Sequence, residues 1–176
     1  CFLLKAEEDT REDWADLSKR VELCLTSGGG IGVDYSVYRE KGAPLGRTGG
    51  VASGPVSKMI MINDIGRAIR QGGDRRSAIY GSLSAEHPDA EMLLYVKDWD
   101  KIEIAGTGKS LADVKELDFN FPAPLDGTNI SLNYGDKWMS RYKRTGDPGS
   151  VFRQNVRQAM KSSEPGFSFN FGAKSD

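Results

Sequence analysis

Three clusters of glycine within residues 27–82 constrain the fold of this chain more than any other feature. The clusters lie at residues 28–30, 49–50 and 72–73. Glycine has no Cβ, so it can take positive φ angles and lets backbone N–H groups approach a ligand closely. Short apolar runs at residues 31–35 and 78–81 alternate with the clusters. This arrangement is typical of α/β proteins that bind nucleotides in loops at strand ends.

A helix is predicted between the second and third clusters. Ser53 can cap its N-terminus, Pro55 suits its first turn, and apolar residues continue to Ile69 at helical spacing. The apolar stripe is wide, so we expect the helix to be largely buried. Planar guanidinium groups at its C-terminal end suit a polyphosphate, although a solvated cluster that balances the helix dipole is the alternative. These groups belong to Arg67, Arg70, Arg75 and Arg76.

The rest of the chain alternates strands with helices. Further helices are expected at residues 10–25, 88–99, 110–117 and 147–160, and strands at residues 1–4, 31–36, 78–83, 129–134 and 167–171. Thr10 caps the first helix. Trp14, Leu17, Val21 and Cys24 recur at helical spacing, so Cys24 is expected on the buried stripe as a small core residue. The last helix has the apolar stripe Val151, Phe152, Val156, Ala159 and Met160. Residues 37–55 form a glycine-rich loop whose length suggests function.

Two common phosphate-binding motifs are incomplete in this sequence. Val33 stands where the dinucleotide fingerprint needs its third glycine, and Glu103 stands where a P-loop ending in GTGKS needs its first. We therefore interpret GTGKS as a turn before a helix capped by Ser110. His87, the only histidine, is interpreted as a residue at the start of a helix, since no second histidine or cysteine pair offers a metal site. Asp98 and Asp100 are interpreted as solvated residues at a helix end.

Composition excludes several classes of protein. The formal net charge of −1 gives no general attraction to nucleic acid or to an anionic membrane. No apolar run approaches the ~20 residues that span a bilayer, and the first residues do not resemble a signal peptide. Two cysteines are too few for a disulfide framework and suit a reducing, cytoplasmic location.

Several ordered motifs resemble one family. SGGGIG, KGAPL, TGGVASGPVS, IRQGGDRRSA and HPD follow one another, and DGTNISLNYGDKW and EPGFSFNFG come after them. In this order they resemble the large catalytic subunit of ribonucleotide reductases, most like the adenosylcobalamin-dependent class. The likeness spans nearly all of the chain. It implies an α/β fold that forms roughly the first half of a ten-stranded barrel, with residues 1–176 as one partial domain that includes the effector-specificity loops.

The resemblance also implies that the chain is an internal segment. It begins at Cys1, inside an apolar strand, and ends where the family continues into the loop that bears the radical cysteine. A split gene, intein removal or deliberate truncation would each give such a segment. Half a barrel leaves unpaired strand edges, so we expect poor stability alone and no activity without the remaining reductase segments.

The reaction implied by the family replaces the ribose 2′-hydroxyl of a ribonucleotide by hydrogen, with thiyl-radical chemistry and a cysteine pair that becomes a disulfide. Cys1 matches one member of that pair. Residues that match the substrate-binding loops are Ser27, Gly28, Gly29, Gly30, Gln71 and Arg75. Residues that match the site for a deoxynucleoside triphosphate effector are Glu8, Asp9, Arg39, Lys41, Leu45, Arg47 and Arg76. Residues 71–77 match the loop that carries the effector's identity to the substrate base.

The family further implies adenosylcobalamin in the complete enzyme, with a di-iron partner subunit as the alternative, and no metal on this segment. A thioredoxin- or glutaredoxin-type reductant and a homodimer are the implied protein partners. Two other functions compete with this reading of the sequence. One is a P-loop or other nucleotide-binding enzyme, and the other is a non-enzymatic nucleotide sensor built from reductase-like loops.

Overall fold

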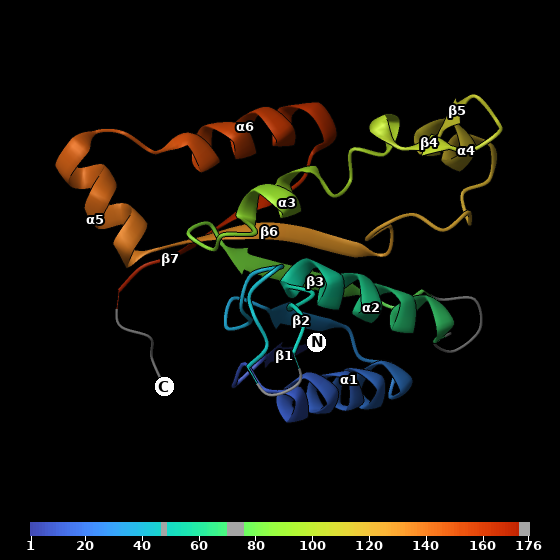
Figure 1. The fold of residues 1–176 in the computed structure, drawn as a ribbon, viewed down its shortest axis with the longest axis horizontal. Coiled ribbons are helices and arrows are strands. Elements are labelled where there is room, and N and C mark those ends of the chain that lie inside the picture. Colours follow the sequence, from blue (N-terminus) through green and yellow to red (C-terminus); the bar gives the residue numbers. More distant parts are fainter. Residues whose placement is uncertain (47–48, 70–75, 173–176) are drawn as a thin grey trace.

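A computed structural model describes residues 1–46, 49–69 and 76–172. Its described strands form one five-stranded parallel sheet, in the order β1-β2-β3-β6-β7, and a separate two-stranded hairpin (Figure 1). The sheet strands are β1 (Phe2–Lys5), β2 (Ile31–Asp34), β3 (Ile79–Ser84), β6 (Thr128–Gly135) and β7 (Gly166–Asn170). The hairpin pairs β4 (Glu103–Ile104) with β5 (Lys109–Ser110).

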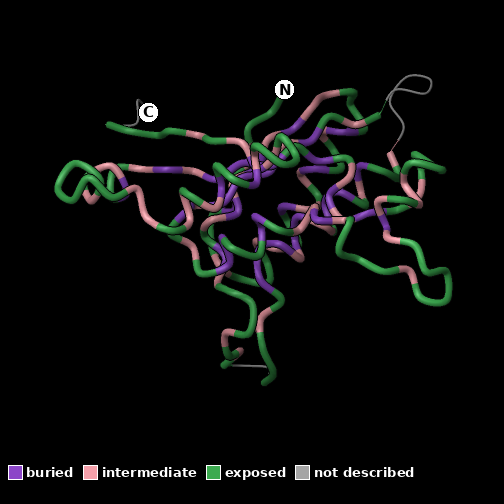
Figure 2. The backbone as a smooth tube through the Cα atoms, turned by 90° about the horizontal axis from the view of Figure 1, so that it is seen from above, coloured by how far each residue is buried: buried purple, intermediate pink, exposed green. Residues whose placement is uncertain are grey.

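Helices connect successive strands of the sheet, as parallel pairing requires. They are α1 (Arg11–Thr26), α2 (Pro55–Ala68), α3 (Ala90–Tyr95), the 3₁₀ helix η1 (Trp99–Lys101), α4 (Leu111–Leu117), α5 (Asp136–Thr145) and α6 (Ser150–Ser162). Buried residues gather in the middle of the molecule, and long connections extend outward from it (Figure 2). None of the described helices combines the length and apolar character needed to cross a membrane.

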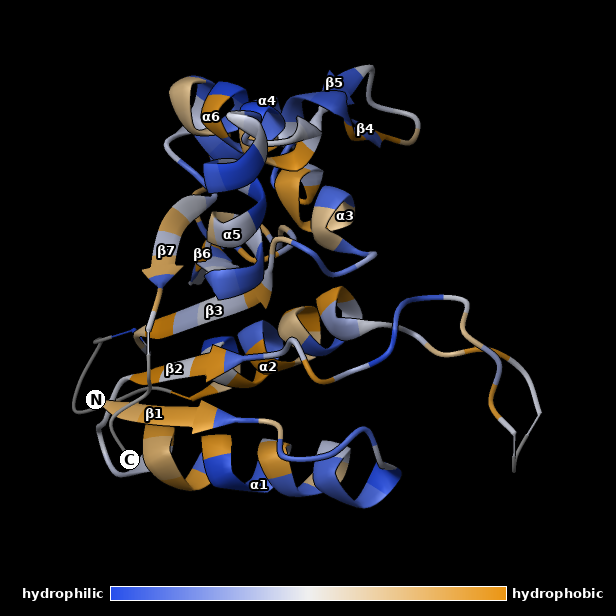
Figure 3. Cartoon of the chain, turned by 90° about the vertical axis from the view of Figure 1, so that its left-hand side faces the viewer, coloured by the Kyte–Doolittle hydropathy of each residue, from blue (hydrophilic) through white to orange (hydrophobic). Residues whose placement is uncertain are grey.

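The two faces of the sheet differ in chemistry. Strand register places Ile31, Ile79 and Thr128 on one face, with Val33, Leu83, Ile130 and Leu132 further along it. These side chains are buried in a core shared with α1, α2 and α3. The opposite face carries Asp34, Tyr80, Ser82, Asn129, Ser131 and Asn133. Hydrophobic β1 and β2 lie beside α1 in the hydropathy view (Figure 3). The sheet thus has an apolar face that packs against helices and an open face that is mostly polar.

Helix starts follow local side-chain chemistry. Thr10 caps α1 as predicted, because its side chain accepts a hydrogen bond from Asp13 N. Ser110 caps α4 in a capping box with Asp113, and GTGKS forms the turn of the β4-β5 hairpin, which confirms the interpretation as a turn. The predicted cap Ser53 is wrong. Gly54 is the N-cap of α2, with φ of 80°, and it makes no side-chain cap.

Three further expectations need correction. Asp98 is not solvated: it is 5% exposed and its carboxylate accepts hydrogen bonds from Gln158 and from Lys101 and Lys161. Helix α6 buries Asn155 and Gln158, whereas Val156 and Met160 of the predicted stripe are exposed. Helix α3 ends at Tyr95, short of the predicted boundary near Trp99. Cys24 is confirmed as a residue packed against the core.

Candidate functional site

Cys1 and the first glycine cluster lie together at the N-terminal ends of the neighbouring strands β1 and β2. The cysteine directly precedes β1, and Gly30 directly precedes β2. Phe2 N donates to Gly30 O at 2.8 Å, which holds the two segments side by side. A Cβ on Gly30 would lie 3.3 Å from Cys1 Sγ and 3.2 Å from the Cβ of Ala78. The thiol of Cys1 is exposed, so it can reach a ligand that covers these strand ends.

The turn before β2 is shaped by glycine and by the end of α1. Gly28 has φ of 85°, in the region that favours glycine. A Cβ on Gly29 would lie 2.4 Å from the ring of Phe2, so a side chain at this position would have to displace that ring. Ser27 is the C-cap of α1, and its hydroxyl donates to Cys24 O at 2.7 Å. The predicted residues 27–30 are therefore brought together with Cys1, and their backbone is exposed or half-buried.

A second group of predicted residues lies beyond the C-terminal ends of the strands. Arg39 Nε donates to Asp9 Oδ2 at 2.5 Å, and its other nitrogens donate to Asp9 O and Pro44 O. The two side chains remain 39% and 33% exposed, so this ion pair can be reached by a ligand. Three segments of chain therefore meet at the Arg39 guanidinium.

The other residues of this group surround the same loop. Lys41 N donates to Asp89 Oδ2, and its side chain is exposed. Leu45 N donates to Gly50 O in a narrow turn, beside a β-bridge between Pro44 and Val51. Glu8 is exposed, one residue before Asp9. Glu8, Asp9, Arg39, Lys41 and Leu45 thus belong to the loops beyond the ends of β1 and β2.

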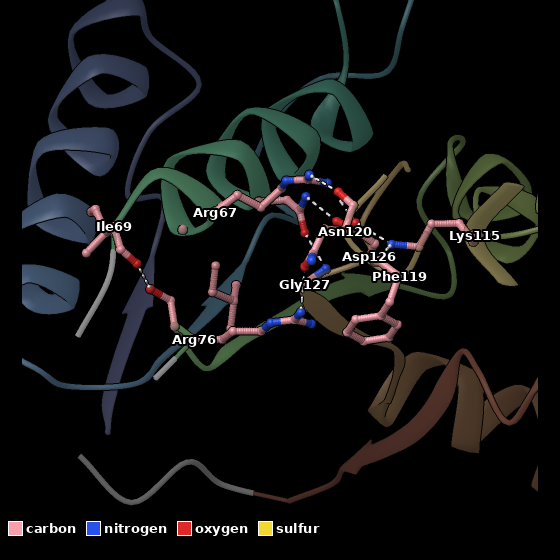
Figure 4. A pocket seen from close by; sticks show the side chains of 12 residues that line it. Arg67, Ile69, Arg76, Lys115, Phe119, Asn120, Asp126 and Gly127 are labelled. Carbon is pink, nitrogen blue, oxygen red and sulfur yellow. Dashed lines mark hydrogen bonds and ion pairs between the residues drawn. The ribbon is translucent and has the colours of Figure 1, made fainter. Parts of the chain in front are cut away.

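Arg76 lies elsewhere, in a cavity of about 570 Å³ between the C-terminal end of α2 and residues 115–127 (Figure 4). Its guanidinium stacks on the Phe119 ring, 4.3 Å from the centroid, and donates to Asn120 Oδ1 at 2.9 Å. Helix α2 has 14 residues, so about 21 Å separates this end of the helix from the Arg39 loop at its other end. The structure therefore does not bring Arg76 together with Arg39.

The cations around this cavity are paired within the chain. Asp126 accepts from Arg67 at 2.7 Å and from Lys115 at 3.0 Å. Burial alone would raise the pKa of Asp126, but the hydrogen bonds from Lys115 and Asn63 and the two positive charges outweigh it and lower that pKa. This network joins α2 to the connection before β6. Sequence reasoning did not find it, because Arg67 and Asp126 are 59 residues apart.

Arg47, Gln71 and Arg75 lie outside the described residues, as does most of the predicted communication loop at residues 71–77. Ser77, at its end, donates from its hydroxyl to Ile69 O at 3.2 Å. Among the described residues, no group of three or more His, Cys, Asp or Glu side chains could hold a metal ion.

The family model of the ribonucleotide reductase barrel domain matches residues 1–164. The chain belongs to the ribonucleotide reductase family. This match confirms the predicted resemblance. It also confirms the expected partial α/β barrel, because the five parallel strands of the structure fit half of such a barrel domain.

Curated relatives of this reductase segment are much longer than the chain. A vitamin B12-dependent ribonucleoside-diphosphate reductase of Thermoplasma acidophilum is 32% identical over 96% of this chain and 21% of the relative. One from Mycobacterium tuberculosis is 37% identical over 83% of this chain and 18% of the relative. The large subunit of a monkeypox virus ribonucleoside-diphosphate reductase is 28% identical over 84% of this chain. The chain spans about a fifth of the length of the relatives it matches.

A solved structure shows the same fold. The alpha subunit of the class Id ribonucleotide reductase of Actinobacillus ureae superposes with a TM-score of 0.68 over 96% of this chain and 26% of that subunit. Its sequence is 15% identical, so this likeness concerns the fold alone. Within the reductase segment, the N-terminal ends of the strands carry the predicted thiol and glycine turn. The loops beyond the C-terminal ends carry Glu8, Asp9, Arg39, Lys41 and Leu45 of the predicted effector residues.

Proposed function

We propose that this chain is the part of a ribonucleotide reductase that supplies one reducing thiol and the loops that bind substrate and effector. In the reaction, the C2′–O bond of a ribonucleotide breaks, a C2′–H bond forms, and the oxygen leaves as water. The two electrons come from a pair of thiols that become a disulfide. Cys1 is one of these thiols, and the other belongs to a part of the reductase outside this chain, since Cys24 packs against the core.

One observation carries this proposal: the exposed Cys1 lies with its Sγ against Gly30 at the N-terminal ends of β1 and β2, in a chain that matches the reductase barrel domain. A glycine at this position leaves room for a ribose beside the thiol, because a side chain there would crowd Sγ. Backbone groups of residues 27–30 can then bind the substrate, together with Gln71 and Arg75 from the communication loop.

The effector site of our proposal is formed by the loops beyond the C-terminal ends of β1 and β2. Arg39 presents a guanidinium group that can bind a phosphate of a deoxynucleoside triphosphate in a bidentate way. Glu8, Asp9, Lys41, Leu45 and Arg47 complete that site, whereas Arg76 lies outside it at the far end of α2. Because the two ends of α2 are about 21 Å apart, the effector acts on the substrate through the helix and through residues 71–77.

Adenosylcobalamin is the cofactor that we propose for the complete enzyme, as the names of the vitamin B12-dependent relatives suggest, and a di-iron partner subunit is the alternative. The residues that the structure describes offer no set of ligands for cobalt. His87 is the only histidine of the chain, and both ring nitrogens bond to the backbone, of Tyr38 and of Asp89. In our proposal, a thioredoxin- or glutaredoxin-type protein reduces the disulfide, and the enzyme acts in the cytoplasm as a homodimer.

The experiment replaces each cysteine by serine in the complete reductase. A hydroxyl cannot supply the electrons that a thiol supplies, so we expect Cys1→Ser to abolish deoxynucleotide formation while substrate still binds. Cys24→Ser is the matched control, and we expect it to keep turnover at a modest cost in stability. Full turnover of the Cys1→Ser enzyme would remove the proposed redox role.

A further inference from the structure

Two side chains of the turn after β3 form hydrogen bonds to the loop that carries Arg39. His87 Nε2 lies 2.7 Å from Tyr38 O, and Asp89 Oδ2 accepts from Lys41 N at 2.9 Å. His87 Nδ1 accepts from Asp89 N, so Nε2 carries the proton and donates to Tyr38 O. The same imidazole thus links the turn to itself and to the loop.

Asp89 is almost fully covered, at 7% exposure. Gly54 packs directly against it, because a Cβ at that position would lie 2.6 Å from Asp89 Oδ2 and 2.8 Å from Lys41 N. The start of α2, the Arg39 loop and the turn after β3 therefore meet at one carboxylate. A buried hydrogen bond of this kind is costly to lose, since the remaining donor loses its partner and its solvation.

The two bonds bracket Arg39 in the sequence. Tyr38 O is held on one side and Lys41 N on the other, so the backbone between them is fixed where the guanidinium reaches Asp9 and Pro44. The recorded bonds of the His87 and Asp89 side chains go to the backbone and not to Arg39. Any effect on a ligand of Arg39 therefore passes through the loop.

We propose that His87 and Asp89 are positioning residues of the effector site, which hold the Arg39 loop in the conformation that binds a deoxynucleoside triphosphate. The inference rests on the proposed function, because it assumes that the effector binds at Arg39. It adds that affinity for the effector depends on two residues that do not contact it.

The test measures binding of dTTP to the complete reductase by calorimetry, together with turnover in the absence of any effector. We expect Asp89→Ala to raise the Kd for dTTP on the order of tenfold, as loss of one buried hydrogen bond predicts. Turnover without effector should stay unchanged. Asp89→Asn keeps an oxygen that accepts from Lys41 N, so it should bind dTTP within about twofold of the wild type. Glu116→Ala, an exposed acid on α4, is the control and should have no effect.

The outcomes separate this inference from the proposed function. If the wild-type enzyme does not bind dTTP, the proposed effector site is wrong. If the wild type binds dTTP and Asp89→Ala binds it equally well, only the positioning role is wrong. A parallel loss of effector-free turnover in Asp89→Ala and Asp89→Asn would mark Asp89 as merely structural and overturn the inference as well. Where Asp89→Ala does not fold, His87→Leu provides the same comparison through the bond to Tyr38 O, and unchanged dTTP affinity there again overturns it.

Discussion

Lys58 is the fully buried cation between α1 and α2. Its ammonium group donates to Trp14 O at 2.5 Å and to Ser18 Oγ at 2.6 Å, and lies 4.8 Å from the centre of the Trp14 ring. Burial lowers the pKa of Lys58 from 10.5 to about 8, although the charge of Asp13 opposes this effect. The free-energy cost of burying this ammonium group between the two helices therefore depends on pH.

The sign of that dependence follows from proton binding. Between the lowered pKa of about 8 and the ordinary value of 10.5, the unfolded chain holds a proton on Lys58 that the folded chain has released. Folding stability should thus rise with pH across this window. We expect the free energy of unfolding of the wild type to increase relative to Lys58→Met from about pH 7 to about pH 10. Thermal unfolding of both proteins over this range checks the prediction, and parallel pH profiles would contradict it.

Single residues also show which features of the fold and of the candidate site could be predicted from the sequence. The cap Thr10, the packed Cys24 and the nearness of Cys1 to the glycine turn follow from local patterns or from the family motifs. The burial of Asp98 does not, because its partner Gln158 lies 60 residues away. The same limit hid the bond from Asp89 to Lys41, which spans 48 residues.

At the scale of elements, the strands were easier to predict than the helices. Burial alternates along β2, with a period of two that is visible in the sequence, whereas in β3 and β6 the small side chains of Ser82 and Ser131 on the other face are buried as well. Helix α5 was not predicted, although Asp136 begins it, basic residues end it, and Gly146 follows with φ of 69°. Its signal is weak because Trp138 is its one buried residue.

Trp138 anchors α5 through an aromatic cluster. It is 5% exposed, its ring lies within 5.5 Å of those of Tyr134, Phe152 and Tyr142, and its Nε1 donates to Pro148 O. We expect Trp138→Ala to lower the free energy of unfolding by about 3–5 kcal/mol, as for other large aromatic residues in cores. Met160→Ala, at a position that is 85% exposed, is the control and should change it by less than about 0.5 kcal/mol. Equal effects of both substitutions, measured by denaturant unfolding, would refute the role of the cluster.

At the scale of the whole molecule, the five parallel strands end in two edges, β1 and β7. Unpaired edges attract further strands, and the edge strand β1 presents Leu3 on the open face of the sheet, where it is 87% exposed. We expect the remaining reductase segments to cover this edge. The fold could be predicted this far because the family motifs fix the order of the strands, whereas composition alone suggested only an α/β protein.

This edge supplies a test of assembly. We expect Leu3→Lys to weaken association of the chain with the remaining reductase segments, because a charge would be placed where an apolar side chain becomes covered. The chain itself should lose little stability, since the side chain is already exposed. Leu117→Lys, at a position that is 74% exposed on α4 and away from the edge, should leave association unchanged. Co-purification of separately tagged segments measures the difference, and equal recovery with both variants would speak against the edge.

The polar open face of the sheet has a thermodynamic consequence for that assembly. Asn133 donates to Ser82 Oγ across this face, and Ser131 and Asn129 lie on the same side. Heat capacity falls when apolar surface is removed from water and rises when polar surface is removed. Closing a barrel over serine and asparagine side chains should therefore change the heat capacity far less than covering an equal area of the apolar face would. Apart from Leu3, the half-barrel thus gains little hydrophobic free energy in its lumen, and closing that part of the barrel should keep nearly the same enthalpy across a wide range of temperature.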